Sequence, residues 1–233
     1  MDGNHPKDFP LDPQMKCTLR EWQQRRKDPS EWIVQASAID GSDSWQPWPI
    51  GMGYEYLNYR DYANANQTGS HTQTVLCCFS ATTDQKRRPT GLNRKTIERT
   101  LHRHGIYNSP FFRNETYWNA LLNHKFIISP EGNGIDCHRH YEALMAGCIP
   151  IVEDNPLTRE KYKGCPVVYT KTYKEITHAL LEKLYTDMLD QTYDFSCVFL
   201  SSYTKEHQAQ IQAQRIFWIQ KLVGLSDDLN RNR

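Results

Sequence analysis

From residue 73 onward, the chain alternates short apolar runs with longer segments in which apolar residues recur at helical spacing. The runs are nearly continuous in apolar and β-branched residues, which is typical of strands buried on both faces of a parallel sheet. They predict four strands, at Thr74–Ser80, Lys125–Ser129, Cys148–Val152 and Pro166–Tyr169.

Helical segments separate and follow these strands. Asn93 and Gly105 are typical start and stop residues for a helix over Arg94–His104, and apolar residues at four-residue spacing indicate an amphipathic helix over Lys174–Leu189. The other predicted helices are Tyr117–Asn123, Cys137–Ala146 and Lys205–Val223. Strands that alternate with helices predict an α/β fold, a Rossmann-like parallel sheet with helices on both faces. Such sheets bind ligands at the carboxyl ends of their strands.

The first 70 residues differ from the rest, because they are rich in Pro, Trp, Tyr, Gly and Asn and show little periodicity. We expect mostly loops there, with a helix at Leu19–Arg26 and a strand at Trp32–Ala36. The sequence therefore predicts three parts: an irregular N-terminal region over residues 1–70, a Rossmann-like domain over 71–225 and a polar tail over 226–233.

Four tyrosines in the N-terminal region form either a stacking platform for a sugar or base or a packed loop surface. They are Tyr54, Tyr56, Tyr59 and Tyr62.

Composition narrows the classes of function. Of the 233 residues, 38% are hydrophobic and 12% are aromatic, which argues against a disordered chain. The net charge of +1 gives no overall attraction to nucleic acid or to an anionic membrane, so we expect no nucleic-acid partner. Without an apolar run of about 18 residues we expect no membrane span, and the first twenty residues do not resemble a signal peptide. The seven cysteines form no CxxC pair and are expected to be buried free thiols.

The stretch over residues 126–152 carries the most informative chemistry. A predicted strand leads through a glycine-rich turn to a helix start, where free N–H groups favour an anion such as diphosphate. Asp136, Arg139 and Glu142 span roughly 120° of that helix and are placed to address one ligand. Arg139 suits a phosphate and Glu142 suits ribose hydroxyls. The alternative is structural, with Asp136 as an N-cap and the other two residues as a surface ion pair.

The order of residues in this stretch resembles the signature of exostosin-like glycosyltransferases. In that signature an SPxGxGxDxxR segment follows an apolar strand and precedes an E-A-L helix and a G-x-x-P-[IV]-[IV] strand. The matching residues are Ser129, Pro130, Gly132, Gly134, Asp136, Arg139, Glu142, Ala143, Leu144, Gly147, Pro150, Ile151 and Val152. A weaker likeness extends over about residues 73–180. The resemblance implies the donor-binding, C-terminal half of a GT-B glycosyltransferase.

The resemblance also implies which residues contact the sugar-nucleotide donor. In similar enzymes a basic residue after the first strand contacts the donor diphosphate; Arg94 is the best match, with Arg87 and Arg88 as rivals. The alternative for this basic run is a solvated loop. The expected donor contacts are Arg87, Arg88, Arg94, Asn133, Gly134, Asp136, Arg139 and Glu142.

We expect neither a bound metal nor a cofactor. GT-B enzymes generally neutralise the leaving diphosphate with basic side chains and a helix N-terminus, and the sequence has no Asp-x-Asp pair. Cys137, His138 and His140 are close in sequence, but the two histidines point to opposite faces of a helix, which disfavours shared metal ligation.

The stereochemical outcome is predicted from a missing pattern. Many retaining GT-B enzymes carry two glutamates in an E-x7-E arrangement, which this sequence lacks, and its absence favours inversion. An inverting transfer needs a general base to deprotonate the acceptor hydroxyl. Candidates within the motif are Glu131, Asp136 and His138, and candidates outside it are Asp40, Asp43 and Glu55.

The sequence thus predicts a metal-independent glycosyltransferase that moves a sugar from a UDP- or GDP-linked donor to a hydroxyl of a glycan or glycoprotein acceptor. Either residues 1–70 form a reduced acceptor side, or a partner chain supplies the missing half. The alternatives are a non-catalytic nucleotide-sugar-binding half-domain acting with a partner chain, and a nucleotide-binding protein of unrelated chemistry. Localisation stays open between the cytoplasm, for a viral or microbial enzyme, and the Golgi lumen, for a domain lacking its anchor.

Overall fold

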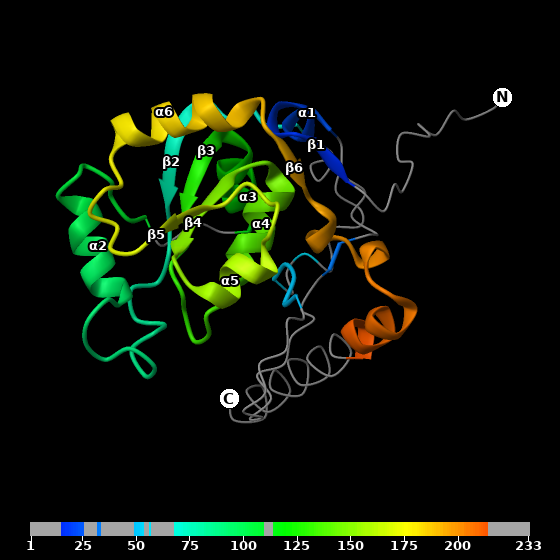
Figure 1. Cartoon of the computed structure of the whole chain (residues 1–233). Helices are drawn as coiled ribbons and strands as arrows, with labels where there is room; N and C mark the ends of the chain where they lie inside the picture. Colours follow the sequence, from blue (N-terminus) through cyan, green and yellow to red (C-terminus); the bar gives the residue numbers. More distant parts are fainter. Residues whose placement is uncertain are drawn as a thin grey trace.

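A four-stranded parallel sheet forms the centre of the molecule (Figure 1). The structure is a computed structural model that describes residues 15–25, 32–33, 49–53, 56, 68–109 and 114–213. The strands lie in the order β2 (Gln73–Cys77), β3 (His124–Ile128), β4 (Ile149–Glu153) and β5 (Val168–Thr170). Every residue of β4 is buried, as expected for a strand covered on both faces. The predicted α/β fold with a parallel sheet is confirmed.

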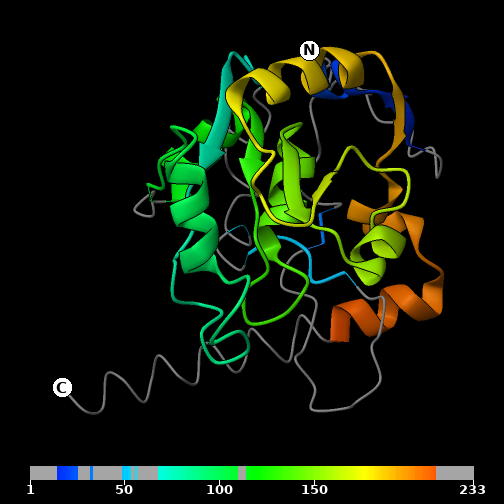
Figure 2. The same ribbon diagram turned by 60° about the vertical axis from the view of Figure 1, so that its left-hand side comes forward.

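Helices flank the sheet, as Figures 1 and 2 show from two directions. Between and after the strands run α2 (Arg94–His102), α3 (Asn114–Asn123), α4 (His138–Ala146), α5 (Pro156–Lys161) and α6 (His178–Leu189). Helices α3 and α4 contact each other and pack on β3 and β4. At the start of β2 and β3, the Glu182 carboxylate of α6 accepts hydrogen bonds from Thr74 and Lys125, which ties α6 across both strands.

Helix ends follow local signals in the sequence. Asn93 and Thr96 form a reciprocal capping box at the start of α2, with both bonds at 3.0 Å. Gly147 ends α4 with φ at 77°, a conformation that glycine adopts without strain. Helix α6 begins at His178, four residues later than the predicted start at Lys174, because the Thr177 side chain caps it by accepting from Leu180 N–H.

Most of the described apolar residues of the N-terminal region belong to the same hydrophobic core as the sheet. Strand β1 (Lys16–Thr18) pairs antiparallel with β6 (Thr192–Asp194), and α1 (Leu19–Gln24) follows directly. Trp22 of α1 is fully buried, stacks on Phe195 with ring centroids 4.1 Å apart, and donates its indole N–H to the Leu144 carbonyl at 2.7 Å. The division of the chain into parts at residues 70 and 225 stays a prediction.

The apolar pattern missed several short elements, namely β1, β6, α5 and the two 3₁₀ turns at Ser196–Val198 and Leu200–Ser202. Within the predicted strand at Trp32–Ala36, Trp32 forms a single bridge to Phe199, and residues 34–36 lie outside the described residues. Residues 205–213 are helical, as predicted, and the rest of that predicted helix is not described.

Of the four N-terminal tyrosines, only Tyr56 is among the described residues, and it packs in the core against Trp32 and Trp118. The candidates Asp40, Asp43 and Glu55 lie outside the described residues. All seven cysteines are described and are free thiols, five of them buried, with Cys137 and Cys197 partly exposed. Across the described segments, no helix combines the length and the apolar character that crossing a membrane requires.

Candidate functional site

The candidate site is built around the loop over residues 129–137, which leads from the carboxyl end of β3 to the start of α4. The loop is closed by a hydrogen bond from Gly132 N–H to the Gly134 carbonyl at 2.9 Å. A Cβ atom on Gly132 would lie 2.9 Å from Nη2 of Arg94, so a larger residue would displace that guanidinium. At Gly134 the nearest atom to such a Cβ is 3.9 Å away, which leaves room beside the loop.

Arg94, at the start of α2, holds this loop in place through hydrogen bonds to its main chain. Its guanidinium donates to three main-chain carbonyls, those of Ser80 at 3.1 Å, Pro130 at 2.9 Å and Glu131 at 2.8 Å. Burial lowers the pKa of Arg94, but an arginine remains a cation in proteins. Arg94 was predicted to contact the donor. Its described hydrogen bonds instead go to the protein's own backbone, and they fix the loop that leads into α4.

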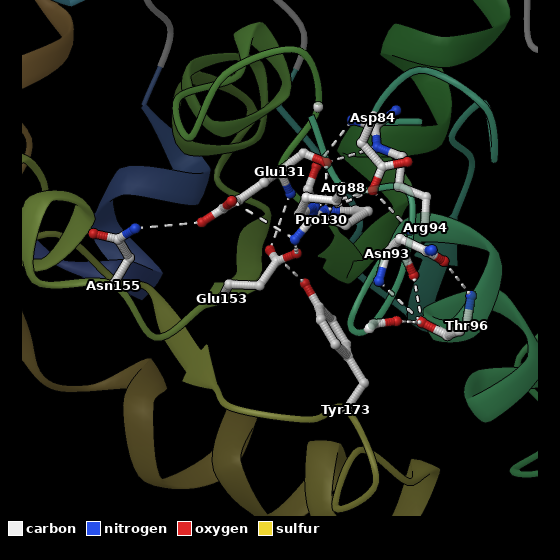
Figure 3. A network of polar contacts seen from close by, with 12 residues as sticks. Asp84, Arg88, Asn93, Arg94, Thr96, Pro130, Glu131, Glu153, Asn155 and Tyr173 are labelled. Atoms are coloured by element: carbon white, nitrogen blue, oxygen red, sulfur yellow. Dashed lines mark hydrogen bonds and ion pairs between the residues drawn. The ribbon is translucent and has the colours of Figure 1, made fainter. Parts of the chain in front are cut away.

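Arg88 and Glu153 form the centre of a buried ionic network (Figure 3). Arg88 pairs with Asp84 at 2.9 Å and with Glu153 at 2.9 Å, and donates to the Glu131 carbonyl. The Glu153 carboxylate also accepts the Glu131 N–H at 3.0 Å and the Tyr173 hydroxyl at 3.1 Å. The network thereby joins the carboxyl ends of β3 and β4 to the loops that follow β2 and β5.

Sequence reasoning did not include Glu153, Asp84 or Tyr173 in the site. A signal was available for Glu153, because it is an acid that ends the apolar run of β4, at the edge where parallel sheets place their polar groups. No local signal distinguishes Asp84 or Tyr173, since their role depends on contacts with distant segments.

Glu131 lies in the same network, with its side chain paired to Arg87 at 2.7 Å. Arg88 approaches the same carboxylate at 3.6 Å, and the Asn155 amide donates to it at 3.4 Å. The structure thus brings together four of the predicted residues, Arg87, Arg88, Arg94 and Glu131.

The described contacts of Asp136 do not include Arg139 or Glu142. Its carboxylate accepts hydrogen bonds from Tyr141 at 2.9 Å and from Tyr162, pairs with Lys161 at 2.7 Å, and lies 3.4 Å from the His140 ring. Burial by itself would raise the pKa of Asp136, but His140 and the Lys161 ammonium hold it well below its usual range. The N-cap of α4 is Cys137 rather than Asp136, so the alternative role of Asp136 as a cap is excluded.

Arg139 occupies the first turn of α4, where the N-cap residue Cys137 makes no side-chain hydrogen bond to the helix. Burial by itself would lower the pKa of Arg139, but its interactions with Tyr117, Cys78 and Glu142 outweigh burial and raise the pKa. Within the part of the chain that the structure describes, its Nε atom is buried without a hydrogen-bond partner. Burial raises the pKa of the neighbouring Cys78 thiol to about 11, so this thiol is neutral at pH 7.

The remaining predicted residues line the same helix start. Glu142 is buried and accepts the N–H of Gly53 at 3.2 Å, so it is not a surface residue. His138 is partly exposed, and its Nδ1 atom lies 2.8 Å from the Gly51 carbonyl. Asn133 is exposed on the loop. Residues 51–53, from the N-terminal region, therefore contact two candidate site residues on α4.

This arrangement suits an anion. A helix start without a side-chain cap presents main-chain N–H groups and the positive end of the helix dipole. Arg139 adds a fixed positive charge within the same turn. Among the described residues, no group of three or more His, Cys, Asp or Glu side chains is arranged to hold a metal ion.

Comparison with known proteins finds a matching family model and curated relatives. The family model described as "RXYLT1 C-terminal domain" matches residues 56–216. The mouse (Mus musculus) protein ribitol-5-phosphate xylosyltransferase 1 is 28% identical, over 66% of this chain and 39% of the mouse protein. The human (Homo sapiens) protein of the same name is 34% identical, over 33% of this chain and 20% of the human protein.

The zebrafish (Danio rerio) protein of that name is 23% identical, over 62% of this chain and 37% of its own length. The chain therefore spans less than half of the length of the curated relatives it matches. Because the family model covers more than half of the chain and includes β2 to α6 with the whole loop before α4, this chain belongs to the RXYLT1 C-terminal domain family.

Proposed function

We propose that this chain is the donor-binding part of a glycosyltransferase, of the GT-B type and related to exostosin-like enzymes. It transfers a sugar from a UDP- or GDP-linked donor to a hydroxyl group. The relatives' names indicate the substrates: xylose as the sugar, and a ribitol-5-phosphate unit as part of the acceptor.

One observation carries this proposal. Within the residues that match the family model, the start of α4 combines an uncapped helix N-terminus with the Arg139 guanidinium, whose Nε atom is buried without a described partner. A diphosphate would accept hydrogen bonds from both, and its negative charge would grow as the sugar leaves. The arrangement supports a transfer in which the protein itself, with no metal ion, stabilises the leaving group.

The general base is the second part of the proposal. Asp136 is a poor base because its carboxylate is held ionised by several donors, and Glu131 is paired with Arg87. His138 fits better. Since the Gly51 carbonyl can only accept a hydrogen bond, Nδ1 of His138 donates to it, and the lone pair then lies on Nε2. We propose that His138 takes the proton from the acceptor hydroxyl in an inverting transfer.

A screen of nucleotide sugars tests the proposed activity. The protein is incubated with UDP-xylose and with other UDP- and GDP-sugars, with and without an acceptor that carries ribitol-5-phosphate, and nucleotide release and transfer are measured. We expect release from a UDP- or GDP-pentose and unchanged rates in EDTA. Binding without turnover of any donor would favour the non-catalytic half-domain acting with a partner chain, and strict dependence on manganese would contradict the metal-independent mechanism.

A further inference from the structure

Two cysteines lie side by side in a part of the fold that the proposed function does not use. Cys165 follows α5, and Cys197 is in the 3₁₀ turn Ser196–Val198. Their Sγ atoms are 3.0 Å apart, although the residues are 32 positions apart in the chain. A covalent S–S bond is about 2.05 Å long, so a movement of about 1 Å would join the two sulfurs.

Main-chain hydrogen bonds hold this pair in place. The Asp194 N–H donates to the Gly164 carbonyl at 2.9 Å, one residue before Cys165. The Cys165 thiol itself lies 3.2 Å from the Asp194 carbonyl. On the other side, the Tyr203 hydroxyl donates to the Cys197 carbonyl at 2.9 Å. Because both backbones are fixed independently of the sulfurs, the closeness of the two thiols is a property of the fold.

The two thiols differ in access. Cys165 is buried, and its hydrogen bond with Cys197 together with burial raises its pKa well above the usual value. Cys197 is partly exposed. A dissolved oxidant therefore reaches Cys197 first, and Cys165 is the second, internal thiol.

We propose that Cys165 and Cys197 form a redox-sensitive disulfide. With a low-molecular-weight disulfide as oxidant, the Cys197 thiolate attacks one sulfur and releases the first small thiol, leaving a mixed disulfide. The Cys165 thiolate then attacks the Cys197 sulfur and releases the second small thiol. Both protein thiols lose their protons and are together oxidised by two electrons, while the small disulfide is reduced to two thiols.

The crosslink would act on the start of α4 through one intermediate residue. Cys165 N–H donates to the Tyr162 carbonyl at 3.0 Å, and the Tyr162 hydroxyl donates to the Asp136 carboxylate. The disulfide would thus fix the segment that contains Tyr162. Tyr162 binds Asp136, which lies directly before the first turn of α4. It would also close the loop that contains β5, α6 and β6.

The test equilibrates the whole chain in reduced and oxidised glutathione over a range of ratios, blocks remaining thiols with an alkylating agent, and maps peptides by mass spectrometry. We expect one crosslinked pair, Cys165 with Cys197, and a melting temperature roughly 5–10 °C higher in the oxidised protein than in the reduced protein. Reversal by a dithiol reductant should restore the lower value.

Variants identify the sulfurs. Cys197→Ser should lose both the crosslink and the oxidation-dependent rise in melting temperature, whereas Cys148→Ala, which also removes one buried thiol, should keep both. The wild-type measurement alone decides the proposal even if a variant fails to fold. Absence of the 165–197 crosslink at every glutathione ratio, or a crosslink that joins other cysteines instead, would overturn it.

Discussion

Arg94 and Arg139 both lie close to the loop before α4, but they make different contacts. Arg94 satisfies three main-chain carbonyls and is enclosed by the protein. Arg139 lies in the first turn of α4, and its Nε atom has no partner among the described residues. Residue type and spacing in the sequence suggested a donor contact for both. Only the three-dimensional contacts separate Arg94, which holds the loop, from Arg139, for which we propose a contact with the donor.

Replacing Arg139 tests the anion site directly. Arg139→Ala should weaken binding of UDP or GDP by about 10- to 100-fold, because a charge-assisted hydrogen bond contributes roughly 1.5–3 kcal/mol. Arg139→Lys should recover part of this loss by keeping the charge without the planar fork. Isothermal titration measures both. Arg159→Ala, at an exposed arginine on α5, is the matched control and should bind like wild type; equal affinity in Arg139→Ala would remove the proposed site.

Asp136 gives a pH-dependent prediction. Its folded pKa is held below that of the unfolded chain, so its stabilising contribution is complete above pH about 3.9 and is lost as the pH falls toward the folded pKa. Asp136→Asn should therefore lower the free energy of unfolding by about 3 kcal/mol at neutral pH, since Lys161 and His140 lose their carboxylate. Denaturant titrations should show this difference staying constant down to about pH 4 and shrinking below it. A difference that grows in acid would contradict the assignment.

At the scale of elements, the sequence predicted the parallel strands well because each is a nearly continuous apolar run. It missed β1 (KCT) and β6 (TYD) because these short strands include polar residues and form no apolar run. Helix α5 did carry a signal, since Asn155 caps it and Pro156 occupies its first turn. The late start of α6 was misjudged because Ile176 fits the helical spacing and yet lies in the preceding turn, buried in the core.

The start of α6 can be tested at its cap. Thr177→Ala should lower the free energy of unfolding by about 1 kcal/mol, because the Leu180 N–H loses its acceptor. Thr177→Ser keeps the hydroxyl and should stay close to wild type. Chemical denaturation measures both variants. If alanine and serine destabilise the protein equally, the hydroxyl is not the cap.

At the scale of the whole molecule, the N-terminal region is joined to the sheet by contacts that sequence patterns do not encode. The sequence predicted an irregular, mostly looped region over the first 70 residues. In the structure, Trp22 lies in the core and residues 51–53 contact His138 and Glu142 of α4. Such long-range contacts depend on the folded chain. The sequence therefore predicted the loop and the helix that form the candidate site. It did not predict the separate roles of the residues in the site, because these roles depend on long-range contacts.

Substitutions at Trp22 test how much the N-terminal region contributes to the stability of the whole molecule. Trp22→Ala should lower the free energy of unfolding by about 3–5 kcal/mol, since it empties a fully buried site beside Phe195. Trp22→Phe should cost less, because it keeps the aromatic packing and loses the hydrogen bond to Leu144. Thermal and denaturant unfolding should both report one transition that shifts as a unit. A separate low-temperature transition would show that the N-terminal region unfolds independently.

The pairing of β1 with β6 also has a consequence for synthesis on the ribosome. Lys16 is translated before the parallel sheet, but its partner Asp194 emerges only after the whole sheet has been made. Contacts between such distant segments form late, since loop closure must precede them. We expect the surface that later packs against Trp22 to stay exposed on the nascent sheet until β6 has been made. A chaperone that binds apolar segments would act during this interval.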